Sequence, residues 1–184
     1  MACLQKLSGD VTWGCRLQAD RIGTLGRYEE ALFINASDIS SFTSAIGSPA
    51  TVTMNSGTRG YILDAVNNSI KVTVAKKGGE LFPIMYDPSV IMRVPSTLFS
   101  SETGSSSPIT NAKTVIALKG SNGYTIIGLG APLVCTEIEG DSTSSEYLTL
   151  TFGTEEGQTG STIYGISRAT YEALKVSAPK APAV

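Results

Sequence analysis

Short apolar segments separated by turn residues constrain this chain more than any other feature of its sequence. From about residue 50 onward, runs of about five to eight residues rich in Val, Ile, Thr, Tyr and Phe alternate with clusters of Gly, Asn, Ser and Asp. This alternation is typical of strands joined by tight turns. Charged residues make up only 16% of the chain, which is low for a helix-rich soluble protein. The sequence predicts an all-β, mainly antiparallel fold, arranged as one β-sandwich or barrel-like domain over residues 1–184.

Four consecutive strands are predicted in the second half of the chain, each bounded by a turn rich in Gly or Ser. They span residues 113–119, 124–129, 133–139 and 146–152. Consecutive strands with short turns predict an antiparallel meander. In the last strand Leu148, Leu150 and Phe152 alternate with Tyr and Thr residues. Their side chains are therefore expected to share the face that points to the core.

The first half of the chain predicts a hairpin and a half-buried strand. Residues 51–54 alternate polar and apolar side chains, and the Asn-Ser-Gly sequence that follows is a turn. Residues 59–63 are therefore expected to return as the partner strand. Ile70, Val72 and Val74 fall on one face of a further strand, as burial of one side requires.

Proline interrupts the apolar stretch at residues 81–94. Pro83 and Pro88 have no backbone N–H to donate to a sheet. A strand in this stretch is therefore expected at a sheet edge or at a bulge.

Helix is expected only in one or two short segments. Residues 37–42, with Ser37 as the N-cap, fit a turn or two of helix. Residues 167–175, with Ser167 as the N-cap, fit another. Both segments are too short to change the fold class.

Three segments are predicted to lie outside the body of the domain. Residues 1–30 are expected to form an N-terminal arm, residues 96–111 a long polar loop, and residues 177–184 a flexible tail rich in Pro and Ala. The loop is either a surface excursion or an arm that orders only against a neighbouring subunit. Trp13 in the N-terminal arm is either a core residue or an interface anchor. All three segments are candidate assembly surfaces.

The absence of histidine removes the commonest catalytic chemistry. Without it, Ser-His-Asp and Cys-His catalysis and most catalytic zinc and iron sites are excluded. Cys3, Cys15 and Cys135 are an odd set without metal-binding spacing, so reduced structural thiols are expected. We therefore predict that the chain is not an enzyme, with no catalytic, cofactor-binding or metal-binding residues and no cofactor.

One acidic group has residue types that can carry chemistry. Its members are Glu137, Glu139, Asp141 and Glu146. Such a group could hold a hard cation through carboxylate oxygens, or flank a glycosidic bond. The interpretation that we favour is that these acids solvate the outer face and keep strand edges from aggregating.

The Gly128-Leu129-Gly130 sequence begins like a dinucleotide-binding loop. Leu133 stands where a third Gly would be, and the residues that follow favour a strand over a helix. A simple turn is therefore expected there.

Charge and hydropathy limit the partners that the chain can have. The net charge is −2 and Lys and Arg do not cluster, which argues against binding nucleic acid through a basic patch. No run approaches the roughly 18 apolar residues that span a bilayer, and the first residues lack the pattern of a secretory signal. The chain is expected to be made and folded in the cytoplasm, with no membrane partner.

The most distinctive part of the sequence lies at residues 124–158. It reads Tyr-Thr-Ile-Ile-Gly-Leu-Gly-Ala-Pro-Leu, then Glu-Ile-Glu-Gly-Asp-Ser-Thr, then Tyr-Leu-Thr-Leu-Thr-Phe-Gly-Thr-Glu-Glu-Gly-Gln. Together with Glu-Ala-Leu-Phe-Ile-Asn-Ala-Ser-Asp-Ile-Ser at residues 30–40, it resembles the strands of virion structural proteins of tailed bacteriophages, most closely the major tail tube proteins. The resemblance is one of style and spacing and rests on no single motif.

This resemblance implies a β-sandwich whose strands join those of neighbouring copies into a ring. The rings, expected to be hexamers from the resemblance alone, would stack into a tube that conducts DNA without binding it tightly. Long loops and terminal arms would reach adjacent rings. The implied partners are copies of the chain and other virion proteins, and the implied location is the virion, after synthesis in the cytoplasm of a host bacterium.

Two other kinds of function stay open at this point. A head decoration, head fibre or connector protein of a phage would have a similar sequence character. A carbohydrate-binding β-sandwich or a glycosidase fragment would use the acids at residues 137–146 together with exposed Tyr residues. The first alternative is also virion-associated, whereas the second belongs to a different class.

Overall fold

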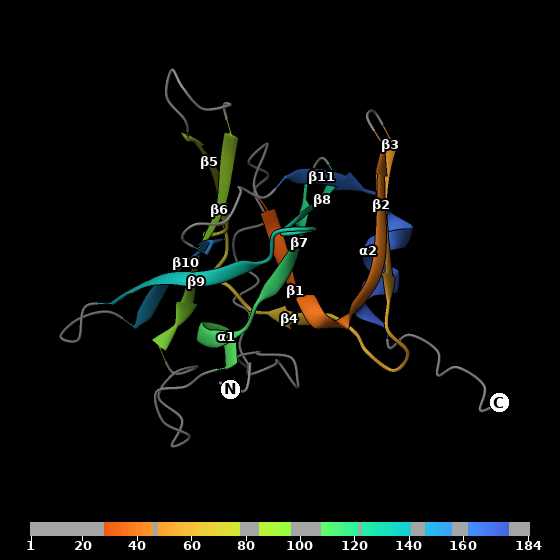
Figure 1. Cartoon of the computed structure of the whole chain (residues 1–184). Coiled ribbons are helices and arrows are strands. Elements are labelled where there is room, and N and C mark those ends of the chain that lie inside the picture. The colour runs from red at the N-terminus through yellow and green to blue at the C-terminus, as the bar shows by residue number, and fades with distance from the viewer. Residues whose placement is uncertain are drawn as a thin grey trace, which may run out of the picture.

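The computed structural model describes residues 28–45, 48–77, 85–96, 108–121, 123–140, 146–155 and 162–176. Most of these residues lie in strands (Figure 1). The strands are β1 (Tyr28–Asn35), β2 (Ile39–Ala45), β3 (Ser48–Met54), β4 (Tyr61–Leu63), β5 (Lys71–Lys77), β6 (Met85–Pro95), β7 (Thr114–Gly120), β8 (Gly123–Ile127), β9 (Leu133–Glu139), β10 (Tyr147–Thr154) and β11 (Ile163–Ile166). Two short helices, α1 (Pro108–Asn111) and α2 (Arg168–Lys175), complete the described part.

The strands form one continuous hydrogen-bonded path. Its order is β2-β3-β11-β8-β7-β9-β10-β6-β5, and β1 pairs with both β7 and β4. All strand pairs are antiparallel except that of β11 with β3, which meet in parallel at Ile166 and Ala50. The prediction of an all-β, mainly antiparallel fold with short helices is thus confirmed. A sandwich of two separate sheets is not established, because the path is unbroken from β2 to β5.

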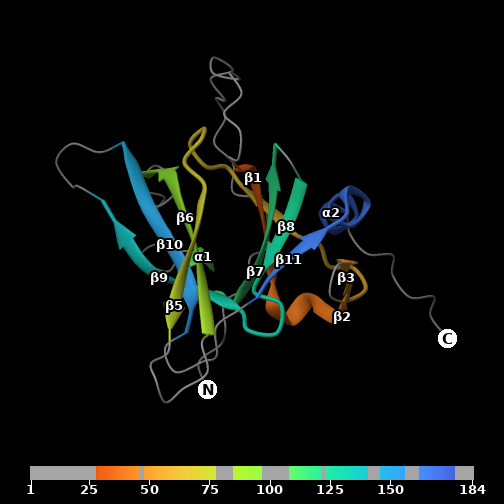
Figure 2. The same ribbon diagram turned by 90° about the horizontal axis from the view of Figure 1, so that it is seen from above.

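The path bends back on itself where β7 meets β9. Only one residue pair, Thr114 with Leu133, joins these two strands. Beyond it β9, β10, β6 and β5 form what we call the outer layer, which lies against the central layer of β4, β1, β7, β8 and β11 (Figure 2). Phe33 of β1 and Phe152 of β10 meet edge to face between the layers, with ring centroids 5.0 Å apart.

The middle of the central layer is buried on both sides. Ala31 and Phe33 of β1 belong to the first core, which the outer layer covers. Leu32 and Ile34 belong to a second core, which the β2–β3 hairpin and α2 cover. The same alternation holds along β7. Because side chains on a strand point alternately to opposite faces, a strand covered on both faces reads as a continuous apolar run.

The hairpin predicted between residues 51–54 and 59–63 is wrong. β3 pairs with β2, and β4 pairs with β1 instead. The backbone N–H of Asn55 donates a hydrogen bond of 2.7 Å to the Asp38 carbonyl oxygen, next to the Ile39–Met54 pair of β2 and β3. The Thr58 N–H donates one of 3.1 Å to the Asn55 carbonyl oxygen and closes the turn that follows β3. β4 then pairs with β1 because Leu63 is buried in the first core and Ile62 packs against the second.

The helix predicted at residues 37–42 is also mostly wrong. Only Ala36–Asp38 forms a single 3-10 turn, and Ile39 begins β2. This stretch of Ile, Ser, Phe and Thr favours a strand once β3 is available as a partner. The helix predicted at residues 167–175 is confirmed, with the Ser167 hydroxyl accepting a hydrogen bond from the Thr170 N–H at 3.0 Å.

The predicted meander breaks between β8 and β9. The pairs β7–β8 and β9–β10 are hairpins as expected, but β8 pairs with β11 on its other side. The connection crosses from one layer to the other, because Leu129 is buried in the second core and Leu133 in the first. Burying both side chains requires the chain to leave the plane of β8.

The predictions for β5 and β6 hold in part. Ile70 is buried and Val72 packs against the first core, but Val74 on the same face is 51% exposed. The pairing of β6 with β10 covers Val90–Pro95, and Pro88 lies two residues before it. At Pro88, β6 therefore pairs only with β5. Pro88 is thus at a local edge, as expected, and Pro83 lies outside the described residues.

A polar cluster fixes α2 to the central layer. The hydroxyl of the buried Tyr171 donates a hydrogen bond of 2.9 Å to Glu30 of β1, and the Lys175 ammonium forms an ion pair with the same carboxylate. Burial raises the pKa of Glu30, but the hydrogen bonds from Lys175 and Tyr171 outweigh it and leave the pKa below its ordinary value of 4.5. Burial and the nearby carboxylate hold the pKa of Tyr171 far above its usual range.

Replacing Tyr171 with Phe should therefore destabilise the fold. The ring and its packing are retained, but a hydrogen bond to a charged group is lost, which costs about 1.5–3 kcal/mol. Urea denaturation followed by circular dichroism measures the change. The matched control is Glu172→Gln, because the Glu172 carboxylate is 51% exposed and lies 3.9 Å from Lys175. That change should cost less than about 0.5 kcal/mol, and equal effects of the two variants would contradict the role of Glu30.

The same cluster predicts a loss of stability in acid. Because the pKa of Glu30 is lower in the folded chain than 4.5, the unfolded chain takes up a proton first as the pH falls below that value. The stabilisation is complete above the unfolded pKa and is lost as the pH falls through the folded pKa. The difference in unfolding free energy between the natural chain and Tyr171→Phe should shrink over this window, and a constant difference would contradict the prediction.

Candidate assembly interface

The outer layer ends in two strands that each lack a partner along most of one side among the described residues. β9 pairs with β10, and on its other side only Leu133 meets a described strand, at Thr114 of β7. β5 pairs with β6, and on its other side the described chain offers only a single bridge between Ile70 and Tyr28, just before the strand begins. Two strands therefore present backbone N–H and C=O groups along open edges.

The directions of these two strands suit head-to-tail joining. Within the outer layer β9, β10, β6 and β5 pair antiparallel in turn. The layer has an even number of strands, so β9 and β5 run in opposite directions. A second copy in the same orientation would place its β5 antiparallel beside β9 of the first, and the alternation would continue without a break.

The two edges carry opposite charges. Glu137 of β9 pairs with Thr151, which pairs with Ile91, which pairs with Lys71 of β5. Directly paired residues share a face, so Glu137 and Lys71 lie at opposite ends of one row on the face turned away from the first core. Glu139 adds a second exposed acid to the β9 edge. Lys71 at the start of β5 is exposed and gives that edge a positive charge.

Large apolar side chains also stay exposed on these strands. Ile138 of β9 is 46% exposed and Val74 of β5 is 51% exposed. Edge strands of soluble proteins are more often shielded by charge or covered by other elements. Ile138 lies between two acids on one edge, and Val74 lies on the same strand as Lys71 on the other, a combination that fits surfaces that meet in an assembly.

The acidic group of the sequence is thus divided by the structure. Glu137 and Glu139 lie on the β9 edge, Glu146 is exposed just before β10, and Asp141 lies outside the described residues. The described residues contain no group of three His, Cys, Asp or Glu side chains placed to hold a metal ion. Glu137 and Glu139 are therefore the members of the group that lie together, and they lie on the β9 edge.

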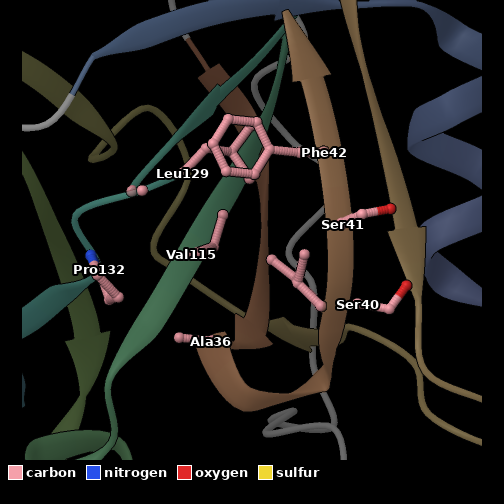
Figure 3. Close-up of a pocket in the computed structure, with 10 residues that line it drawn as sticks. Ala36, Ser40, Ser41, Phe42, Val115, Leu129 and Pro132 are labelled. Atoms are coloured by element: carbon pink, nitrogen blue, oxygen red, sulfur yellow. The ribbon is translucent and has the colours of Figure 1, made fainter.

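In the described part of the chain β2 is a third edge strand, and a groove runs along it (Figure 3). β3 pairs with β2 on one side, and the groove of about 420 Å³ lies on the other. Its lining consists of Ala36, Ile39, Ser40, Ser41, Phe42, Val115, Gly128, Leu129, Gly130 and Pro132. Because consecutive residues of β2 line it, the backbone of the strand forms one wall.

The side chains of β2 divide between the groove and the hairpin. Figure 3 shows Phe42 reaching across the groove toward Leu129, whereas the Ser40 and Ser41 hydroxyls point toward β3. The Ser40 hydroxyl donates a hydrogen bond of 3.1 Å to the Thr53 carbonyl. Phe42 remains 38% exposed. The groove is therefore mainly apolar, and none of its lining residues is charged.

The Gly128-Leu129-Gly130 sequence forms the opposite wall as a turn, which confirms that prediction. Gly128 and Gly130 have φ values of 102° and 83°, which only glycine adopts readily. A Cβ on Gly128 would also lie 3.1 Å from the Thr114 carbonyl oxygen. These two glycines let the chain cross between the layers.

The remaining residues singled out in the sequence are distributed as follows. Cys135 is a half-buried free thiol on β9, and burial raises its pKa. Ile109, at the end of the predicted polar loop, is buried in the first core, which corrects the expectation that residues 96–111 all lie at the surface. Trp13, Cys3, Cys15 and residues 97–107 and 177–184 lie outside the described residues.

Among the described helices, none has the length and apolar character to cross a membrane.

Sequence reasoning missed the β2 edge and its groove. The only signal was the run of residues 39–58, which contains no charged side chain. The groove itself joins three parts of the chain that are distant in sequence, around residues 36–42, 115 and 128–132.

Comparison of the chain with protein-family models, with curated proteins and with solved structures found no match. The strand edges and the groove are therefore the features that bear on function.

Replacing Gly128 with Ala should destabilise the fold. A side chain at φ 102° is strained and would crowd the backbone of β7, at a cost of about 1–3 kcal/mol. Gly165→Ala is the matched control, because a Cβ on Gly165 would meet nothing within 4 Å. Thermal unfolding should show a fall of roughly 2–12 °C for Gly128→Ala and little change for the control. A fall of the same size in both variants would contradict the role of the turn.

Proposed function

We propose that this chain is a non-enzymatic structural protein that assembles with copies of itself, as the tail tube subunit of a tailed-bacteriophage virion. In this proposal the β9 edge of one copy joins the β5 edge of the next. The single observation that carries it is the row that ends in Glu137 at one edge and Lys71 at the other. Head-to-tail joining of this kind closes into a ring when the rotation between copies permits.

Each junction would satisfy groups that one copy leaves open. The backbone groups of β9 and β5 would pair, each hydrogen bond contributing about 1 kcal/mol net. Burial of the exposed Ile138 and Val74 would add about 25 cal/mol per Å² of apolar surface removed from water. A closed ring repeats this junction at every subunit and leaves no open edge in the outer layer.

The charge of the outer layer suits a channel through which DNA passes. Lys71 and Arg93 lie on the face turned away from the first core, and so do Glu137 and Glu139 in the same rows. Two cations balanced by two anions give little net attraction for phosphate, and tight binding of DNA depends on such attraction. The resemblance of residues 124–158 to major tail tube proteins supports the tube over other positions in a virion.

The purified chain should form rings or tubes. Negative-stain electron microscopy and sedimentation velocity would detect them, over a range of concentrations because the junctions are individually weak. A chain that stays monomeric at high concentration would contradict the proposal.

Charge reversal at either edge should weaken assembly, and reversal at both should restore it. Lys71→Glu or Glu137→Lys places like charges at the junction, at a cost of about 0.5–1 kcal/mol for each contact. The concentration needed for assembly should rise several-fold in each single variant and return toward the natural value in the double variant.

Arg168→Glu is the matched control for these variants. It makes the same charge change as Lys71→Glu at an exposed site on α2, outside the outer layer. Assembly should be unaffected. If this variant weakens assembly as much as Lys71→Glu does, then net charge and not the edge is responsible.

A further inference from the structure

The free edge of β2 differs from the other two open edges because it has no charge to protect it. The β9 edge carries Glu137 and Glu139, and the β5 edge carries Lys71. By contrast, residues 39–58, which include all of β2 and β3, contain no charged residue. Proteins commonly shield an exposed strand edge with charge or cover it with another segment. A neutral edge of this length is suited to being covered.

The groove beside β2 has the two features that recognition of an extended segment requires. One wall is the backbone of residues 39–42, which can pair with an added strand. The floor and the opposite wall are apolar, formed by Val115, Leu129 and Pro132. An added strand would place alternate side chains into the groove, one of them beside Phe42. The segment that fits is extended, uncharged and provided with one large apolar side chain.

The N-terminal part of the chain contains such a segment. Residues 11–15 read Val-Thr-Trp-Gly-Cys and lie between two charged residues, Asp10 and Arg16. In an extended conformation Val11, Trp13 and Cys15 would point to one side. Trp13 is the only tryptophan in the chain, and a groove of about 420 Å³ is large enough to receive an aromatic side chain.

The length of the chain allows this segment to reach the groove. The described part begins at Tyr28, and Ala36 lines the groove at the far end of β1. Strand β1 covers about 23 Å at about 3.3 Å per residue. The residues between Trp13 and Tyr28 can extend over about 50 Å. This is enough to return along β1 to the groove of the same copy, or to cross to that of a neighbour.

We propose that the groove beside β2 is the docking site of the N-terminal segment, in which residues 11–15 add a strand to β2 and Trp13 lies beside Phe42 and Leu129. This inference does not depend on ring formation, because the segment and the groove belong to the same chain.

Tryptophan fluorescence of the full-length protein tests this directly, because Trp13 is the only source of the signal. In the folded protein its emission should be blue-shifted, and acrylamide should quench it several-fold less than in the urea-unfolded chain. Emission and quenching of a fully solvated indole in the folded protein would overturn the proposal.

Two variants then test whether the groove is what protects the Trp13 indole from quenching. Phe42→Asp places a charge in the groove and should shift the emission to the red and restore quenching. Ile163→Asp is the matched control, because Ile163 is 37% exposed, Phe42 is 38% exposed and Ile163 does not line the groove. Far-UV circular dichroism checks that both variants fold. Protection that survives Phe42→Asp in a folded protein, or that is lost equally in the control, would overturn the proposal.

Dilution separates the two routes to the groove. Protection that stays constant on dilution indicates docking within one copy, and protection that falls with dissociation indicates docking on a neighbour. Either result supports the groove as the site. The fluorescence result is also distinct from the assembly result, since a monomer with protected Trp13 would contradict the proposed ring and support the docking.

Discussion

The double burial of the central layer is the constraint on which the rest of the structure depends. The strands β1, β7 and β8 have apolar side chains on both faces, so two covering layers are needed to remove them from water. The outer layer supplies one cover, and the β2–β3 hairpin with α2 supplies the other. Within the described part of the chain, the outer layer ends at β9 and β5 and the hairpin ends at β2, and each of these strands has an edge with few or no backbone partners. The need to cover one sheet twice thus leaves open edges at the periphery.

Local pattern predicted the elements of this fold better than their pairing. β7, β8, β9 and β10 were expected within two residues of their bounds, because alternation of side chains is a property of the segment itself. Pairing is decided by which faces are buried. The prediction of a hairpin after residue 54 failed because Leu63 is buried against β1. The predicted meander failed because Leu129 and Leu133 belong to different cores, a division that the local sequence does not contain.

The candidate interfaces show the same limit. The acids at 137 and 139 were visible in the sequence, and the structure adds that Lys71 ends the same row from the other side of the layer. That relation joins strands far apart in the chain, so no spacing could reveal it. The groove is similar, since residues near 36–42 and 128–132 come together only after the chain crosses between the layers. Absence of histidine limits the chemistry, whereas the open edges give the positive argument for assembly.

The single contact between β7 and β9 has a consequence for the shape of any larger assembly. Thr114 with Leu133 is the one backbone pair between β7 and β9, and one bridge joins Tyr28 of β1 to Ile70 beside β5. With so few backbone links, the orientation of the outer layer depends largely on side-chain packing in the first core, as at Phe33 and Phe152. A close-packed core responds to a change in side-chain volume by shifting the elements around it. Substitutions in this core would alter the angle at which one layer meets the other. The curvature of a ring built from the outer layer would thus be adjusted from the interior of each subunit.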